Sequence, residues 1–170
     1  MAFNPDPFTQ VYSALWNLLE SHAEFTGLVK LANRIRYVAD ADRRPGKPQV
    51  TASDLPEVRI VPAGGPIRVA PSSTSGCSVV EDFLVQIASG DQRLQQAAFP
   101  VKWQVLRALA NGRDQLGLPF VRKLRCVEAR ETLSPAPGAA GNAAADRGVG
   151  GWSVLLRVSV EMWFSNDDLA

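Results

Sequence analysis

The only histidine, His22, is the first residue to consider for chemistry, because an imidazole serves as a general base or a metal ligand near neutral pH. Either role needs partners, and no carboxylate or cysteine cluster with metal-ligand spacing accompanies it. His22 follows the apolar positions Tyr12, Leu15 and Leu19 at the end of a helical pattern. We therefore predict a helix-end or partly buried structural histidine. The sequence also has no GxSxG nucleophile elbow.

Three acidic pairs are candidates for acid–base or metal chemistry: Asp40/Asp42, Glu81/Asp82 and Asp167/Asp168. Adjacent residues of a strand point to opposite faces, so Glu81 and Asp82 are poorly placed to share a proton or a metal ion. The loop that contains Asp40 and Asp42 lacks the other oxygen ligands of a calcium site. We predict solvated carboxylates at all three pairs, with no catalytic residue, no metal and no cofactor.

Residues 88–92 join an expected strand to an expected helix, which is a common position for a phosphate-binding loop. The turn holds one glycine and no GxxxxGK[ST] pattern, and an aspartate beside the helix start opposes anion binding. Asp91 is better explained as the residue that caps the helix.

The composition indicates one globular domain, residues 1–170, with 46% hydrophobic and 21% charged residues. The net charge of +1 gives no long-range attraction to nucleic acid or membranes. No apolar run reaches the roughly 20 residues that span a bilayer, and the N-terminus lacks the pattern of a signal peptide. We expect synthesis in the cytoplasm, no membrane association, and reduced thiols at Cys77 and Cys126.

Two segments have helical periodicity. Asp6 and Pro7 provide an N-cap and a first-turn proline for a helix with an apolar stripe at Phe8, Val11, Tyr12, Leu15, Leu18 and Leu19. A second stripe runs through Leu94, Ala98, Val101, Val105 and Leu109, and Pro100 either opens or kinks that helix. Residues 28–38 fit either a short second helical turn or an edge strand around Ile35 to Val38.

Alternation of apolar and polar residues predicts strands at 57–62, 79–88, 120–133 and 152–164. In the second strand the core-facing row contains Val79, Glu81, Phe83, Val85 and Ile87. Segments 39–56, 64–76 and 134–151 are expected to be flexible connections. The element order predicts an α+β two-layer sandwich: a mainly antiparallel four-stranded sheet, two helices on one face, and a long hairpin formed by the last two strands.

The third strand is unusually basic, with Arg122 on one face, Lys123 and Arg125 on the other, and Arg130 further along. A nucleic-acid surface normally interleaves such charges with exposed aromatics, and Phe120 is the only aromatic in this strand. A charged protein interface or a solvated sheet face is the favoured interpretation. A small nucleic-acid-binding module is kept as the alternative from a different functional class.

The segments "EDFLVQIASGDQRL" and "WSVLLRVSVEMWF", together with the leading amphipathic helix and a strand that ends in proline, resemble the small tail-terminator and tail-completion proteins of long-tailed bacteriophages. The resemblance lies in element order, length and texture over nearly the whole chain, without a diagnostic motif. The long segments 39–56 and 134–151 depart from the compactness of that family.

The resemblance implies a non-enzymatic virion protein at the junction between tail and neck, assembled in the host cytoplasm. Such a protein forms a ring, commonly a hexamer, caps the head-proximal end of the tail tube and contacts neck or head-completion proteins, with DNA passing through the lumen. A head–tail connector or another minor tail protein of the same fold is the alternative within this class. We expect the contacts at 64–76 and 134–151 and on the basic strand, with these candidate residues: Arg68, Arg122, Lys123, Arg125, Arg130 and Arg147.

Overall fold

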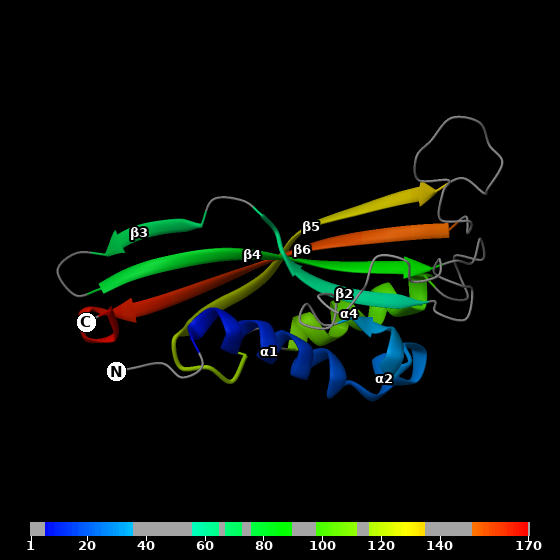
Figure 1. Ribbon diagram of the computed structural model, residues 1–170, viewed down its shortest axis with the longest axis horizontal. Helices are drawn as coiled ribbons and strands as arrows, with labels where there is room; N and C mark the ends of the chain where they lie inside the picture. Colours follow the sequence, from blue (N-terminus) through cyan, green and yellow to red (C-terminus); the bar gives the residue numbers. More distant parts are fainter. Residues whose placement is uncertain are drawn as a thin grey trace, which may run out of the picture.

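A computed structural model describes residues 6–35, 56–64, 67–72, 76–89, 98–111, 116–134 and 151–169. Its helices gather on one face of a long, twisted sheet, which confirms the predicted α+β two-layer arrangement (Figure 1). The described part of the sheet has six strands in the order β1-β2-β4-β6-β5, and β3 also pairs with β4. The prediction of four strands is therefore too low.

Helix α1 (Pro7–Glu20) begins as the sequence predicts. The Asp6 carboxylate accepts a hydrogen bond from the backbone N–H of Thr9 at 3.0 Å, and Pro7 occupies the first turn. Helix α2 (Ala23–Leu28), a 3-10 turn η1 (Leu31–Asn33) and strand β1 (Arg34–Ile35) follow. Both alternatives for residues 28–38 are thus partly correct, since a helical turn leads into a very short edge strand.

Helix α4 (Ala98–Asn111) carries Pro100 in its first turn, so this proline opens the helix and does not kink it. Its buried positions include the predicted Val101, Val105 and Leu109. Leu94 and Asp91 lie outside the described residues. A short helix α5 (Asn166–Leu169) ends the described chain.

Two long central strands, β4 (Gly76–Ser89) and β6 (Gly151–Ser165), pair antiparallel along nearly their full length. Strand β5 (Val121–Ser134) pairs with the other side of β6, as predicted for a hairpin. Strand β2 (Glu57–Pro62) pairs with the second half of β4, and β1 adds a parallel edge to β2. Gly76 starts β4 where a Cβ atom would lie 2.1 Å from the carbonyl oxygen of Phe164, so only glycine fits there.

Strand β3 (Arg68–Ser72) corrects the expectation of one continuous flexible segment over 64–76. The strand forms because β4 begins at Gly76 and not at Val79, so its first residues offer a hydrogen-bonding edge to residues 68–72. Most of the other two expected flexible segments, residues 39–55 and 135–150, lies outside the described residues.

The core lies between the helices and the alternate residues of β4 and β6. Phe83, Val85 and Ile87 face Val158, Leu156 and Val154 across the ladder, and all are buried. Helix α1 adds Val11, Leu15, Trp16 and Leu19. Period-two burial on the strands and the apolar stripes on the helices therefore define one continuous core, as the sequence patterns predict.

Candidate interaction surface

Among the described residues, His22 and the carboxylates of Glu81 and Asp82 have separate surroundings. Nε2 of His22 lies 3.1 Å from Oε1 of Gln104 on α4, and Nδ1 lies 3.4 Å from Oε2 of Glu24. His22 therefore joins the end of the first helix to α4, which confirms a partly buried structural histidine. Within the described residues, no three His, Cys, Asp or Glu side chains are grouped to hold a metal ion.

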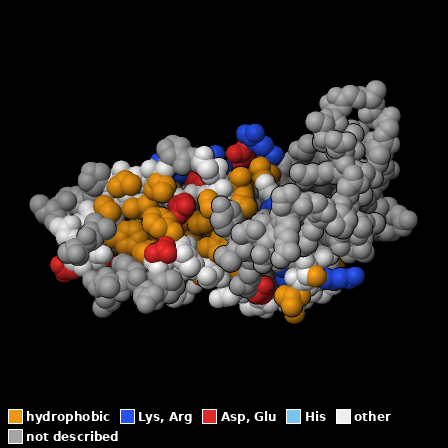
Figure 2. All heavy atoms as spheres, viewed as in Figure 1, with side chains coloured by type: hydrophobic (Ala, Val, Ile, Leu, Met, Phe, Trp, Pro, Cys, Tyr) orange, Lys and Arg blue, Asp and Glu red, His pale blue; other side chains and the backbone are white. Residues whose placement is uncertain are grey.

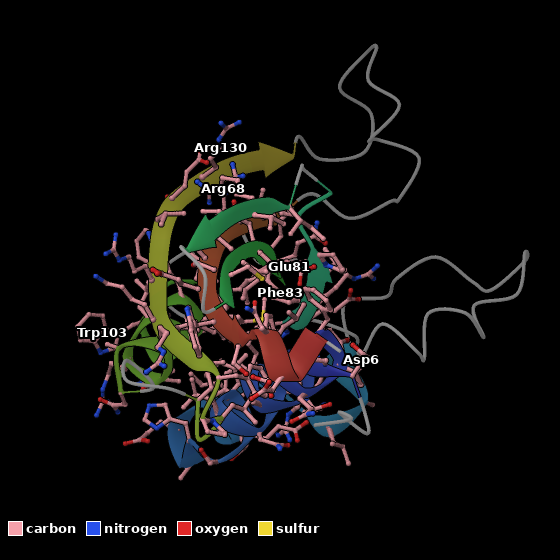
Figure 3. The ribbon with its side chains drawn as sticks, turned by 90° about the vertical axis from the view of Figure 1, so that its left-hand side faces the viewer. Asp6, Arg68, Glu81, Phe83, Trp103 and Arg130 are labelled. Atoms are coloured by element: carbon pink, nitrogen blue, oxygen red, sulfur yellow. The ribbon has the colours of Figure 1, made fainter. Side chains whose placement is uncertain are left out.

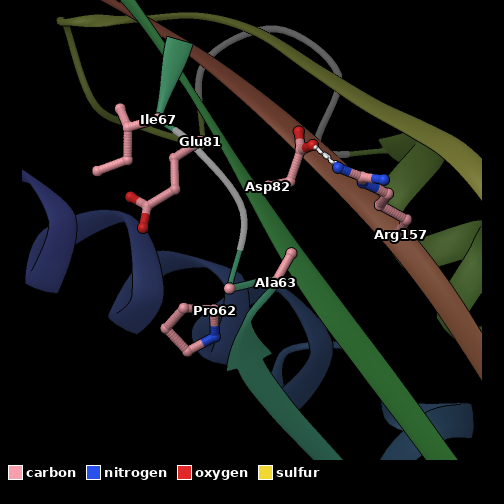
Figure 4. Close-up of a pocket in the computed structure, with 7 residues that line it drawn as sticks. Pro62, Ala63, Ile67, Glu81, Asp82 and Arg157 are labelled. Atoms are coloured by element: carbon pink, nitrogen blue, oxygen red, sulfur yellow. Dashed lines mark hydrogen bonds and ion pairs between the residues drawn. The ribbon is translucent and has the colours of Figure 1, made fainter.

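A small pocket of about 130 Å³ opens where β2 ends and before β3 begins (Figure 4). Glu81 and Asp82 both line this pocket, but Glu81 points toward α1 and Asp82 points away, toward Arg157. The two carboxyl groups therefore cannot act as a general acid–base pair, as the strand alternation predicts. A wider hollow beside α1 is lined by residues without titratable groups: Gln10, Ser13, Ala14, Asn17, Leu18, Ser21, Leu116 and Leu118.

Asp82 lies at the centre of an ion-pair cluster on the sheet face away from the helices. Its Oδ2 accepts from Nη2 of Arg157 at 2.6 Å, and its Oδ1 lies 3.3 Å from Nη2 of Arg68. Burial raises the pKa of Asp82, but hydrogen bonds from Ser159 and Arg157 and the two positive charges outweigh burial and lower it below the ordinary value. Arg68, a predicted interaction residue, is thus exposed but already ion-paired.

Glu81 corrects the expectation that the Glu81/Asp82 pair is merely solvated. It lies on the core-facing side of β4, opposite Val160, and its Oε2 is buried without a hydrogen-bond partner among the described residues. Burial, followed by the negative charges of Asp6 and Asp82, raises the pKa of Glu81. Among the described residues, Glu81 is therefore a carboxylate without a cation partner.

We expect Glu81→Gln to raise the free energy of unfolding of the monomer by about 1 kcal/mol at pH 7, discounted for partial exposure. The pKa of Glu81 is higher in the folded than in the unfolded chain, so ionisation costs stability above the folded pKa. This cost vanishes below the ordinary value of 4.5, and the gain from the substitution should fade as the pH drops through that range. Urea unfolding at several pH values measures it.

Asp82→Asn is the matched control on the neighbouring residue, and its effect should have the opposite sign. Its carboxylate has a lowered pKa and holds Arg157, so its loss should destabilise the chain at pH 7. Equal destabilisation by both substitutions would contradict the assignment of Glu81 as an unpaired carboxylate.

Two β-bulges determine which side of β5 its basic side chains occupy. Val121 pairs with Met162 and Lys123 pairs with Glu161, so Arg122 is an extra residue in the ladder. The Arg122 guanidinium lies over the ring of Trp163, 5.4 Å from its centroid, on the face away from the helices. The prediction that Arg122 and Lys123 lie on opposite faces is therefore wrong, because the bulge brings them to the same side.

Four predicted interaction residues thus come together on one exposed strand: Arg122, Lys123, Arg125 and Arg130. Arg130 also donates to the carboxylate of Glu128. Arg147 lies outside the described residues. A second bulge, between Cys126 and Glu128, leaves Val127 53% exposed beside these cations.

Exposed apolar side chains accompany charge on two opposite sides of the molecule. We name one side the basic flank, which consists of Trp103, Arg122, Lys123, Arg125, Val127 and Arg130. We name the other the acidic flank, which consists of Asp6, Phe8, Ile67, Val69 and Glu81. Trp103 and Val69 are 59% and 61% exposed, respectively. Figure 3 places Trp103 and Asp6 on opposite sides of the curved sheet.

The acidic flank includes an apolar area that surrounds carboxylates. Figure 2 shows hydrophobic side chains gathered around acidic ones over β3, β4 and the start of α1. Ile67 and Val69 contribute exposed surface there, and they flank Arg68, which turns to the other face and binds Asp82. The sequence placed contacts within residues 64–76 but did not identify Ile67, Val69 and Glu81 as their surface, because that segment was expected to be flexible. The signal that was available is Glu81 within the core-facing row of β4.

The sheet also has open edges. Among the described strands, β5 pairs only with β6, and β3 pairs only with β4. An unpaired strand edge presents backbone N–H and C=O groups that another chain can bind. Open edges, exposed apolar residues and charge lie close together on each flank, a combination typical of protein interfaces.

The comparisons with known proteins concern the fold. The sequence matches no protein-family model and no curated protein. The structure is similar to a chain of a solved structure described as the virion of a native gene transfer agent particle, with a TM-score of 0.52 and 20% sequence identity. The match covers 88% of this chain and 93% of that chain. At this identity the likeness shows a shared fold. No helix among the described residues is long and apolar enough to cross a membrane.

Proposed function

We propose that this chain is a non-enzymatic structural protein of a phage-like particle, where it acts as a tail-terminator or tail-completion subunit. The observation that carries the proposal is the likeness to a gene transfer agent virion chain over almost the full length of both chains. Because the match extends over 88% of this chain, the proposal does not depend on one short motif.

The proposed subunit forms a ring, with six copies as the expected number, on the head-proximal end of the tail tube. The edges of β3 and β5, which are open among the described strands and lie on opposite sides of the sheet, support such assembly, because a head-to-tail contact that closes on itself produces a ring. The ring would bind the tail tube protein on one side and a neck or head-completion protein on the other. A head–tail connector of the same fold is the alternative within this class.

We expect the purified chain to form a ring of defined mass, either alone at high concentration or on addition of the tail tube protein. Sedimentation velocity over a hundredfold range of concentration, repeated with the tube protein, measures this. Both conditions are needed, because a subunit of this kind can stay monomeric until it meets the tube. A chain that remains monomeric in both conditions would contradict the proposal.

A nucleic-acid-binding module is a second candidate, favoured by the four exposed cations of β5 and by Trp163, an aromatic ring beneath Arg122. Binding through phosphate contacts falls steeply as salt increases. Filter binding to single- and double-stranded DNA at low salt separates the candidates. Tight binding with a steep salt dependence, without ring formation, would favour the nucleic-acid module.

A further inference from the structure

We propose that the basic flank of one copy docks on the acidic flank of the next, so that Lys123 and Arg125 supply cations to Glu81, which has none in the described part of its own chain. This inference rests on the proposed function, because it names the contact that builds the ring. A second copy of this chain is the partner that binds each flank.

Glu81 and Asp6 make the acidic flank negative. Its Oε2 is buried and unpartnered within the described residues, and Asp6 adds a second negative charge nearby. A buried carboxylate oxygen without a donor is costly, and a guanidinium or ammonium group from a partner removes that cost. The Arg68 guanidinium is not available for this purpose, since it contacts Asp82 on the opposite face.

The basic flank carries the complementary positive charge. Lys123 and Arg125 are exposed and lie two residues apart in β5, facing Glu161 and Ser159 across the ladder. Arg122 is held beside them against the ring of Trp163. The cations therefore project from an edge strand, where a neighbouring molecule can approach closely.

Each flank also exposes apolar side chains that could pack against those of the other flank. Ile67 and Val69 are 50% and 61% exposed on the acidic flank, and Trp103 and Val127 are 59% and 53% exposed on the basic flank. Protein interfaces combine such apolar centres with charged rims, and aromatic residues are enriched in them. Nucleic acid fits the acidic flank poorly, since its phosphates offer no cation to Glu81.

The position of the flanks determines the type of contact. Strands β3 and β5 lie toward opposite sides of the sheet, and Figure 3 shows Asp6 and Trp103 far apart on those sides. The two surfaces of one copy therefore cannot satisfy each other. Docking of unlike surfaces between copies is heterologous, which repeats around a ring and leaves neither flank exposed.

The test uses two complementary variants of the full chain. The first variant, Lys123→Glu with Arg125→Glu, makes the basic flank negative, and the second variant, Glu81→Lys, makes the acidic flank positive. Each variant alone brings like charges together at every contact, so we expect the concentration for half-assembly to rise at least about tenfold. Lys30→Glu, which changes an exposed cation outside both flanks, should assemble like the native chain.

An equimolar mixture of the two variants is the decisive sample. In alternating copies, the reversed basic flank of the first variant meets the lysine introduced at position 81 of the second. The native basic flank of the second variant meets the native Glu81 of the first, so every contact is again attractive. We expect the mixture to assemble within about twofold of the native concentration. Normal assembly of either variant alone, or a mixture that stays as weak as its components, would overturn the inference.

A second experiment leaves the charges of both flanks unchanged and measures how fast the thiol of Cys126 reacts. It decides the matter if circular dichroism shows that one of the charge variants does not fold. Cys126 is exposed on β5, and Cys77→Ser removes the other thiol. Maleimide labelling of Cys126 should slow at least about fivefold in assembled rings relative to dilute monomer, because the docked neighbour covers β5. Equal labelling rates overturn the docked basic flank but leave the proposed function standing. A native chain that assembles under no condition overturns both.

Discussion

Phe83→Ala is expected to lower the free energy of unfolding by about 3–5 kcal/mol, the range for removing a buried phenylalanine. Phe83 is 2% exposed in β4, between Val158 of β6 and Pro62 of β2 in the ladder, and it belongs to the core cluster shared with the helices. Loss of its ring leaves a cavity at the centre of the molecule. Domains of this size have a total stability of about 5–15 kcal/mol, so the substitution removes a large share of the free energy of unfolding.

Leu84→Ala is the matched control, since Leu84 is the next residue of the same strand. Its side chain points to the face away from the helices and is only half-buried, so we expect a loss of about 1 kcal/mol. Urea unfolding curves of both variants, compared at a constant m-value, give the two numbers. A loss for Leu84→Ala as large as that for Phe83→Ala would contradict a core confined to the helical side of the sheet.

Alternation within strands allowed the fold class to be predicted from the sequence. In β4 and β6, apolar residues at every second position specify which face is buried, because successive side chains point to opposite faces. The cap at Asp6 is likewise a local signal, and α1 begins as it predicts, whereas Pro100 left two alternatives that only the first turn of α4 resolved. Such features depend on residues within a few positions of one another.

Strand β3 could not be predicted in the same way. Its sequence, RVAPS, is short and contains a proline, which usually marks an edge or a loop. It forms a strand only because the first residues of β4 extend beside it, and that depends on β4 pairing with β6 as far as Ser165. The exposed Ile67 and Val69 became visible as a surface only after this non-local pairing was known.

The candidate surface was predicted in part. The cations of β5 were identified by residue type, but simple alternation assigned Arg122 to the wrong face. Val121 and Leu124 are both buried and lie three positions apart. Buried residues of a regular strand lie two positions apart, so this spacing indicates the extra residue of a bulge. Glu81 was placed in the core-facing row yet interpreted as solvated, since the absence of a partner depends on residues far away in the chain.

Loss of this protein from a particle that encodes it is expected to have the largest functional effect. Under the proposed role, a tube that lacks this subunit continues to polymerise, because nothing covers its last ring of tube subunits. We therefore expect overlong tails that are not joined to filled heads. Supplying the native gene in trans should restore the length, and Lys30→Glu should restore it equally well.

Electron micrographs of particles produced without this protein test the central proposal most directly, with tail length and head attachment as the readout. The proposal predicts a broad distribution of tail lengths that extends well beyond the native length, with tails detached from heads. Tails of normal length that remain detached would favour the connector alternative. Tails of normal length attached to filled heads would contradict a role at the junction between tail and neck.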